Sequence, residues 1–223
     1  MKVIITGATG MVGRGVLLEC LEDLRVEKVL IITRRPSGES HPKLAEIIHT
    51  DFTEYTTIKD QLTGYDACFA IMGVSAAGMN EETYTQLTYH ATVSLARTLF
   101  EANPNMTFTY VSGKGTDSTE RGRLMWARVK GKTENEILRM GFQKALMFRP
   151  GLILPLRGIT SSTRLYQFFF DYFMWLIRLV QWISPNSVTD TTRMGQAMIN
   201  AHLLHSERDV LDPIDINLLA AKT

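Results

Sequence analysis

The fold is decided by residues 6–13, which read Thr6-Gly7-Ala8-Thr9-Gly10-Met11-Val12-Gly13. The glycines stand three residues apart, directly after an apolar run and at the start of a helical pattern. In a strand–turn–helix unit of this kind, Gly7 permits the tight turn, Gly10 lets the backbone approach a pyrophosphate, and Gly13 lets the helix pack closely on the sheet. Free N–H groups at the helix start favour phosphate. We therefore favour a dinucleotide-binding turn over an empty glycine turn, and we expect the ligand to meet Gly7, Thr9, Gly10, Met11, Val12 and Gly13.

Apolar, β-branched runs alternate with helical patterns through the first 150 residues. This alternation predicts an α/β protein, a three-layer doubly wound parallel sheet (Rossmann fold) with helices on both faces. The expected strands are Lys2 to Thr6, Val26 to Thr33, Ala45 to His49, Asp66 to Met72, Met106 to Ser112 and Ala145 to Arg149. The expected helices are Met11 to Asp23, Thr57 to Leu62, Glu81 to Ala102 behind an Asn80 N-cap, and Leu124 to Met140.

The pattern changes after Pro150, but no Gly/Ser linker marks a second domain. We therefore predict a single domain over residues 1–223, in which residues 151–223 form a small C-terminal helical cap on the substrate side. Apolar residues cover more than one side of an aromatic helix expected at 163–183. This helix would wall the substrate crevice and form a homodimer, unless its own domain covers it fully. The cap would also hold a helix from Thr191 to Leu204 and a late edge strand from Pro213 to Leu219.

Composition indicates an ordinary globular protein, because 45% of the residues are hydrophobic and 21% are charged. A formal net charge of +1 gives no electrostatic argument for nucleic acid. The two cysteines, Cys20 and Cys68, exclude a disulfide scaffold and favour a reducing compartment. The N-terminus has no signal-peptide pattern, so we expect a cytoplasmic protein, with contact of 165–183 with a membrane surface left open. No metal is expected, because His202 and His205 have no evident third ligand.

Several segments together resemble one known superfamily. The N-terminal GATGxxG string and its downstream partners are similar to the short-chain dehydrogenase/reductase superfamily, in its extended and atypical branches. The finer patterns Ser-x-Lys-Gly at 112–115 and Val-Lys-Gly at 129–131 resemble the branch of the human Tat-interacting protein of 30 kDa. The downstream partners are Asp51-Phe52, Val111-Ser112-Gly113, Lys130 and Arg149-Pro150-Gly151.

The resemblance implies where a nicotinamide cofactor would lie. Asp51 and Phe52 would face the adenine ring, and residues 71–73 would line the middle of the cofactor. Gly73 fits a close approach to a ligand, although a plain glycine at a strand end is an alternative reading. Pro150 and Gly151 would touch the nicotinamide.

The end of the second strand decides between the two nicotinamide cofactors. An acidic residue there would bind the ribose 2′-OH of NAD. The sequence has Thr33-Arg34-Arg35 instead, with no acid before Glu39. A guanidinium suits a 2′-phosphate, so Arg34 and Arg35 favour NADP(H) over NAD(H), unless both are merely solvated surface charges.

At the catalytic position, this sequence differs from the short-chain dehydrogenase/reductase superfamily that it otherwise resembles. Its reductases use a Tyr four residues before a Lys, with a Ser after the fifth strand; the Tyr donates the proton and the Lys holds the nicotinamide ribose. Lys130 and Ser112 are present as catalytic candidates, but Trp126 stands where the Tyr should be. An indole N–H cannot exchange a proton as a general acid near neutral pH. Tyr84 and Tyr166 are candidates to donate the proton in place of the missing Tyr; the alternative is that both are packing aromatics.

Two functions from different classes remain open. One is an NADP-dependent oxidoreductase that transfers a hydride to or from an unknown small carbonyl or alcohol. The other is a non-catalytic NADPH-binding protein with a regulatory or redox-sensing role. The non-catalytic function remains open because Trp126 stands where the proton-donating Tyr is expected.

Overall fold

A seven-stranded parallel sheet forms the middle layer of the computed structural model, which describes residues 1–159, 188–204 and 208–222. The strands run in the order β3-β2-β1-β4-β5-β6-β9, with the crossover between β3 and β4 that a doubly wound fold requires. Their bounds are β1 Lys2–Thr6, β2 Lys28–Thr33, β3 Leu44–Ile48, β4 Ala67–Ala70, β5 Thr107–Val111, β6 Lys144–Phe148 and β9 Val210–Leu211.

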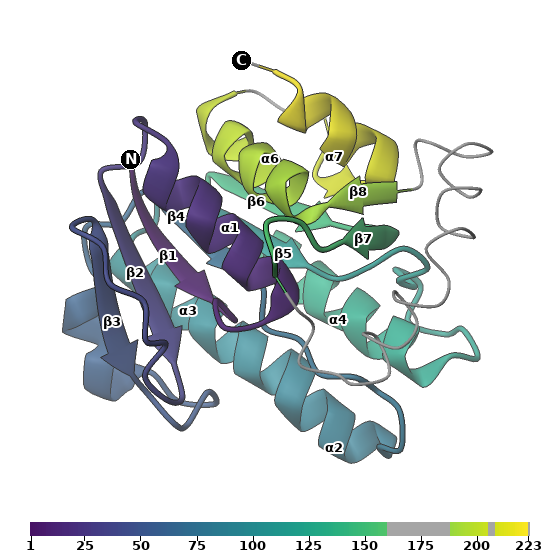
Figure 1. Cartoon of the computed structure of the whole chain (residues 1–223). Coiled ribbons are helices and arrows are strands. Elements are labelled where there is room, and N and C mark those ends of the chain that lie inside the picture. Colours follow the sequence, from purple (N-terminus) through teal and green to yellow (C-terminus); the bar gives the residue numbers. More distant parts are fainter. Residues whose placement is uncertain (160–187, 205–207, 223) are drawn as a thin grey trace.

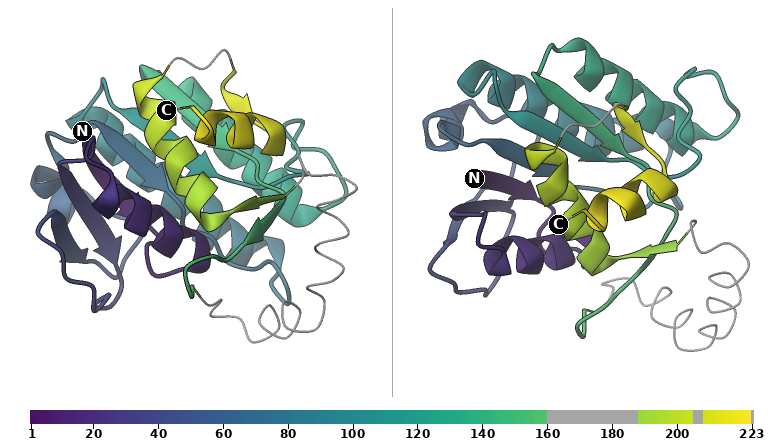
Figure 2. Two further views of the ribbon diagram at one scale, coloured as in Figure 1. Left: turned by 45° about the horizontal axis from the view of Figure 1, so that its top comes forward. Right: turned by 90° about the horizontal axis from the view of Figure 1, so that it is seen from above.

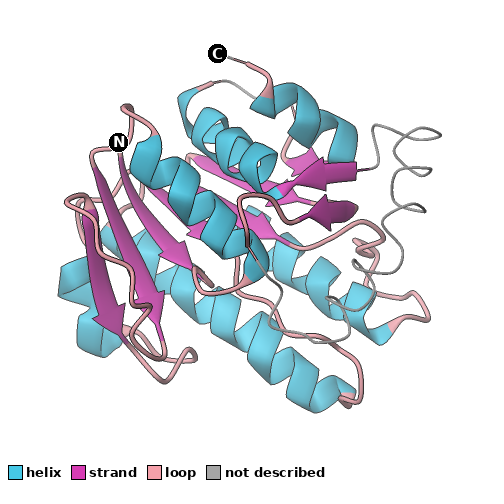
Figure 3. Ribbon diagram, viewed as in Figure 1, coloured by secondary structure: helices cyan, strands magenta, loops and turns pink. Residues whose placement is uncertain are grey.

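Helices cover both faces of this sheet (Figures 1 and 3). One face carries α1 (Met11–Glu22), α6 (Thr191–Leu203) and α7 (Pro213–Ala220). The other carries α2 (Glu81–Thr85), α3 (Ala91–Ala102), α4 (Met125–Arg139) and a 3₁₀ helix, Thr56–Leu62. The predicted three-layer, doubly wound parallel sheet is therefore confirmed.

Alternate residues of each strand supply the two cores. In β1, Val3 and Ile5 pack with the α1 side while Ile4 packs with the α3 side, and all three are fully buried. Burial on both faces explains why the central strands read as continuous apolar runs rather than as an alternation.

The long helix expected from Glu81 to Ala102 is interrupted. Asn80 caps its start as predicted, since its side chain accepts from the Thr83 N–H at 2.9 Å. A π-helical turn, Gln86–His90, then separates α2 from α3. Such turns insert an extra residue into the helical ladder and occur frequently beside functional sites.

The edge strand expected from Pro213 to Leu219 is wrong, because this segment forms helix α7. Asp212 and Asp215 form a reciprocal capping box, and Pro213 occupies the first helical turn. These start signals outweigh the loose alternation of apolar residues. The edge strand is β9, two residues earlier in the chain, and a second small sheet pairs β7 (Leu152–Leu154) with β8 (Val188–Asp190).

Helices α1 and α6 lie side by side (Figure 2). Two glycines permit this approach. A Cβ on Gly15 would lie 2.4 Å from the Thr191 Cβ, and one on Gly195 would lie 2.6 Å from the Glu19 Cγ. Helices α6 and α7 thus complete the layer begun by α1. The aromatic segment 163–183, expected in the cap and in a dimer contact, lies outside the described residues.

Within the described ranges, no helix combines the length and apolar character needed to cross a bilayer.

Candidate functional site

The glycine-rich turn joins β1 to α1 at the carboxyl edge of the sheet. Gly7 has a φ of +75°, and a Cβ there would lie 2.8 Å from the backbone of Ile71, so the turn rests directly on the end of β4. A Cβ on Gly13 would lie 2.0 Å from the Gly7 carbonyl oxygen. Both positions therefore require glycine, and the helix starts as close to the sheet as the backbone allows.

The start of α1 is open to an anion. Its N-cap is Gly10, which has no side chain to satisfy the first N–H groups, whereas Asn80 caps α2 and Asp190 caps α6. No group in the described part of the chain accepts from the N–H of Met11, Val12 or Gly13. Thr9 beside them is exposed. Free N–H groups and the positive end of the helix dipole together suit a phosphate.

Two exposed arginines follow β2, next to this helix start. Neither Arg34 nor Arg35 has an ion-pair partner among the residues that the structure describes. The nearest acid along the chain, Glu39, accepts from the Arg14 guanidinium of α1 at 2.9 Å. Glu39 is thereby held by a cation, so the region beyond β2 presents positive charge.

Asp51 and Phe52 follow β3 and shape the next loop along this edge. The Asp51 carboxylate accepts from the Thr53 hydroxyl at 2.6 Å and from the Thr53 N–H at 2.9 Å, which lowers its pKa. Phe52 is half-buried and meets His49 and Tyr55 edge-on, with ring centroids 6.1 Å apart in each pair.

Gly73, after β4, borders open space. A Cβ built on it would meet no atom of the described residues within 4 Å. Since its φ is not in the left-handed region, the protein's own packing gives no reason for glycine here.

Lys130 and Ser112 are brought together by α4 and β5. The Lys130 ammonium donates to the Ser112 carbonyl oxygen at 2.8 Å and lies 5.8 Å from the centre of the Tyr110 ring. Burial lowers the pKa of Lys130 to about 8, and the negative charge of Glu134 opposes part of this shift. The carboxyl end of β5 therefore carries a cation that changes charge just above neutral pH.

The Ser112 hydroxyl is engaged inside the protein. It donates to the Glu134 carboxylate and also lies 3.2 Å from the Phe148 carbonyl oxygen. Sequence reasoning named Ser112 but missed Glu134, which is only 1% exposed. The available signal was its spacing of four from Lys130, which places both on one side of α4.

Glu134 also pairs with Arg149, the residue that follows β6. The Arg149 Nε donates to the Glu134 Oε1 at 3.0 Å, and its Nη2 donates to the Oε2. These hydrogen bonds raise the pKa of Arg149. The same Nη2 reaches the Ser118 hydroxyl at 2.5 Å, which ties in the loop after β5.

Pro150 and Gly151 continue beside the segment that follows β5. The Ser112 N–H donates to the Phe148 carbonyl at 2.9 Å, and the Lys114 N–H donates to the Pro150 carbonyl at 2.8 Å. The two chain segments therefore run in parallel beyond the ends of their strands.

Trp126 lies one turn before Lys130 on α4. Its ring packs against the loop after β5, with its Cη2 3.4 Å from the position of a Cβ on Gly115. Tyr84 is 2% exposed and burial raises its pKa, as it does for the fully buried Tyr110. Neither phenol presents a readily released proton to solvent, and Tyr166 lies outside the described residues.

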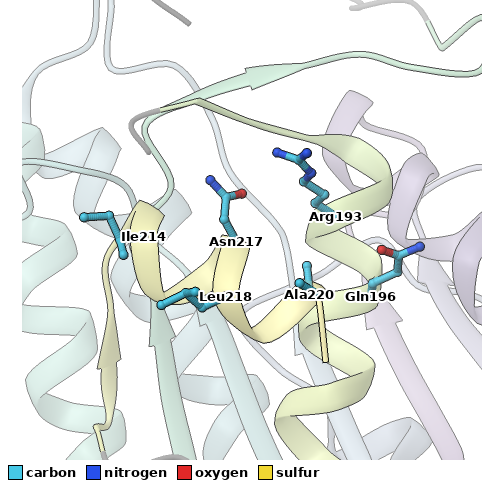
Figure 4. Close-up of a pocket in the computed structure, with 7 residues that line it drawn as sticks. Arg193, Gln196, Ile214, Asn217, Leu218 and Ala220 are labelled. Atoms are coloured by element: carbon cyan, nitrogen blue, oxygen red, sulfur yellow. The ribbon is translucent and has the colours of Figure 1, made fainter. Parts of the chain in front are cut away.

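A separate groove of about 400 Å³ lies between α6 and α7 (Figure 4). Arg193 and Gln196 line it from α6, and Ile214, Asn217 and Leu218 from α7. It shares no residue with the strand ends described above. The described ranges also hold no cluster of three or more His, Cys, Asp or Glu side chains that could bind a metal.

Residues 3–118, just over half of the chain, match the NAD dependent epimerase/dehydratase family. The chain belongs to this family. The expected atypical branch of the short-chain dehydrogenase/reductase superfamily is thereby confirmed at family level, together with its link to nicotinamide dinucleotides.

Curated proteins that are similar in sequence to this chain carry the name FMP52. Protein FMP52, mitochondrial, of Debaryomyces hansenii is 29% identical over 159 residues, covering 70% of this chain and 69% of its own length. The Aspergillus clavatus protein of that name is 27% identical over 216 residues, covering 94% and 90%. The finer resemblance to the Tat-interacting protein is not supported by these names. The expectation of a cytoplasmic protein is wrong, because these relatives are named as mitochondrial proteins.

Several solved structures share the fold of this chain. An oxidoreductase of the short-chain dehydrogenase/reductase family from Burkholderia thailandensis aligns with a TM-score of 0.68 at 17% identity, covering 99% of this chain and 93% of that one. The Helicobacter pylori ADP-L-glycero-D-manno-heptose-6-epimerase gives 0.67 at 16% identity, covering 95% and 75%. The Bordetella bronchiseptica enzyme WbmH, in complex with NAD+, gives 0.63 at 17%, covering 90% and 71%.

Proposed function

We propose that this chain is an NADP(H)-binding oxidoreductase that transfers a hydride to or from a small carbonyl compound or alcohol. One observation carries the proposal. The uncapped start of α1 lies at the same sheet edge as two exposed arginines, Arg34 and Arg35, on the adjoining strand. A pyrophosphate and a 2′-phosphate together would match these two groups of donors.

The remaining residues of the edge would hold the rest of the cofactor. Asp51 and Phe52 would flank the adenine, and the open space beside Gly73 would admit the middle of the molecule. Lys130 would donate to the nicotinamide ribose, and the backbone of Pro150 and Gly151 would contact the nicotinamide. When bound, the cofactor supplies the hydride.

The described residues at this end contribute charge and hydrogen bonding. Lys130 places a cation beside the end of β5, where it would stabilise negative charge that develops on a substrate oxygen. The Ser112 hydroxyl already donates to Glu134, so its donation to a substrate requires that bond to be exchanged. Trp126 provides a flat apolar ring and no exchangeable proton near neutral pH.

The Trp126 position favours a second candidate, a non-catalytic NADPH-binding protein whose bound state regulates another process. It keeps the same cofactor contacts and differs only in lacking turnover. Both candidate functions therefore predict the same NADPH binding, but only the oxidoreductase predicts turnover of a substrate.

Two measurements on the purified chain test the proposal. Titration calorimetry with NADPH and NADH should show tighter binding of NADPH. Absorbance at the nicotinamide band should then report NADPH oxidation with a panel of aldehydes, ketones and quinones. Tight NADPH binding without turnover on any acceptor would favour the regulatory candidate, and equal affinity for both cofactors would contradict the role of the arginines.

A further inference from the structure

We infer that Glu134 is a positioning residue for the nicotinamide end of the site. Its carboxylate links the segment after β5 to the segment after β6, so that both keep the spacing that the cofactor requires. The inference rests on the proposed function, because it assigns a role within the same cofactor site.

The carboxylate of Glu134 is buried and fully engaged. The side chain is 1% exposed, and it receives hydrogen bonds from the Ser112 hydroxyl and from Nε and Nη2 of Arg149. A buried carboxylate is costly unless charged and hydrogen-bonding partners surround it. Ser112 and Arg149 therefore cannot move apart without leaving a buried charge partly unpaired.

The partners of Glu134 belong to the two segments expected at the nicotinamide. Ser112 directly follows β5, and Arg149 directly precedes Pro150 and Gly151. The backbone on the far side is fixed as well, since the Arg149 N–H donates to the Leu211 carbonyl of β9 at 2.9 Å. The segment 149–151 is thus held by Glu134 through the Arg149 side chain, and its backbone is held by β9 on one side and by Lys114, in the segment after β5, on the other.

The adenosine end is built from other elements. It uses the start of α1 and the ends of β2 and β3, none of which supplies a hydrogen bond to Glu134. Loss of the carboxylate should therefore weaken binding of the whole cofactor and spare binding of its adenosine half. A purely structural role in stability would make no such distinction between ligands.

The experiment compares Glu134→Gln with Glu136→Gln. Glu136 lies on the same helix and pairs with the exposed Arg97 at 2.7 Å, so its variant controls for loss of a surface ion pair. Calorimetry would measure the affinity for NADPH and for adenosine 2′,5′-bisphosphate, which carries the adenosine 2′-phosphate without the nicotinamide. We expect Glu134→Gln to lower the affinity for NADPH about ten-fold and to change the affinity for the bisphosphate by less than about two-fold. Glu136→Gln should change neither.

Other outcomes overturn the inference. In the first, Glu134→Gln lowers the affinities for NADPH and for the bisphosphate equally; in the second, it lowers neither affinity. In the third, the wild-type chain binds NADPH no more tightly than the bisphosphate. A wild-type chain that binds neither ligand refutes the proposed function itself. If Glu134→Gln fails to fold, Arg149→Lys is tested in its place. The lysine keeps the positive charge but loses the two-pronged contact with Glu134, so NADPH affinity should fall while the affinity for the bisphosphate is retained.

Discussion

The ammonium of Lys130 lies 2.8 Å from the main-chain carbonyl oxygen of Ser112 and donates a hydrogen bond to it. This bond fixes a positive charge at the carboxyl end of β5, where burial disfavours that charge. Burial lowers the pKa of Lys130, and the negative charge of Glu134 opposes part of this shift, so the ionisation of Lys130 should be measurable.

Replacement of Lys130 by Met should remove a pH-dependent contribution to stability. The folded-state pKa is lowered from 10.5 to about 8, so between these values the unfolded chain binds a proton that the folded chain has lost. The free energy of unfolding therefore rises with pH across this window, and the penalty is fully present below about pH 8. Relative to Lys130→Met, we expect the wild type to gain on the order of 2 kcal/mol between about pH 7 and about pH 10 in urea unfolding. Parallel profiles for the two proteins would contradict the shift.

Loss of Arg34 and Arg35 should remove the preference for NADPH. A charge-assisted hydrogen bond contributes about 1.5–3 kcal/mol, so the double variant with Ala at both positions should weaken NADPH about ten- to hundred-fold. The affinity for NADH should stay within about two-fold, because NADH lacks the 2′-phosphate. Arg121→Ala is a matched control, an exposed arginine on the loop after β5. Equal losses for NADPH and NADH in the double variant would argue against recognition of the 2′-phosphate.

The Trp126 position should select acceptors that need no proton during hydride transfer. A quinone yields a phenolate-like anion whose conjugate acid has a pKa of about 10, as for tyrosine, whereas an aldehyde yields a far more basic alkoxide. With NADPH, we expect the wild type to reduce a simple benzoquinone faster than benzaldehyde. Trp126→Tyr should raise benzaldehyde reduction by at most about 10²–10⁴-fold, while Trp126→Phe should not. Efficient benzaldehyde reduction by the wild type would show that another residue donates the proton.

Substitution of Gly73 distinguishes a ligand-contacting glycine from an incidental one. The described residues leave open space around a Cβ at this position, so Gly73→Ala should change the free energy of unfolding by less than about 1 kcal/mol. If the bound cofactor contacts Gly73, the same methyl group should lower the affinity for NADPH about ten-fold or more. Unchanged affinity in calorimetry would mean that the cofactor does not approach Gly73. Gly13→Ala is the contrasting variant, because its Cβ would overlap the Gly7 carbonyl and destabilise the fold.

The sequence predicted those features that depend on neighbouring residues. The turn at Gly7 and Gly13 was evident because a strand, a tight turn and a helix leave a local signature. The inner strands were evident because burial on both faces produces apolar runs, and Asn80 was a recognisable helix cap.

Features that depend on distant partners could not be read in this way. Glu134 looks like an ordinary helix glutamate until β6 brings Arg149 against it, 15 residues along the chain. The hydroxyl of Ser112 was expected to face a ligand, but its bond to Glu134 depends on the same three-dimensional arrangement. At Pro213 the local signals were in conflict, and the capping box prevailed over the alternation.

The contact of Gly15 with Thr191 and of Gly195 with Glu19 also constrains the order in which the molecule can be assembled. The glycine-rich turn and its helix are synthesised first, yet the apolar side of that layer is closed by residues 191–203, which emerge from the ribosome near the end. A chain that stopped at Ile159 would retain the complete nucleotide-binding motif while exposing core residues such as Val16 and Leu17. Residues 1–159, which carry the recognisable motif, are therefore not a folding unit by themselves, and fragments cut there should aggregate rather than bind.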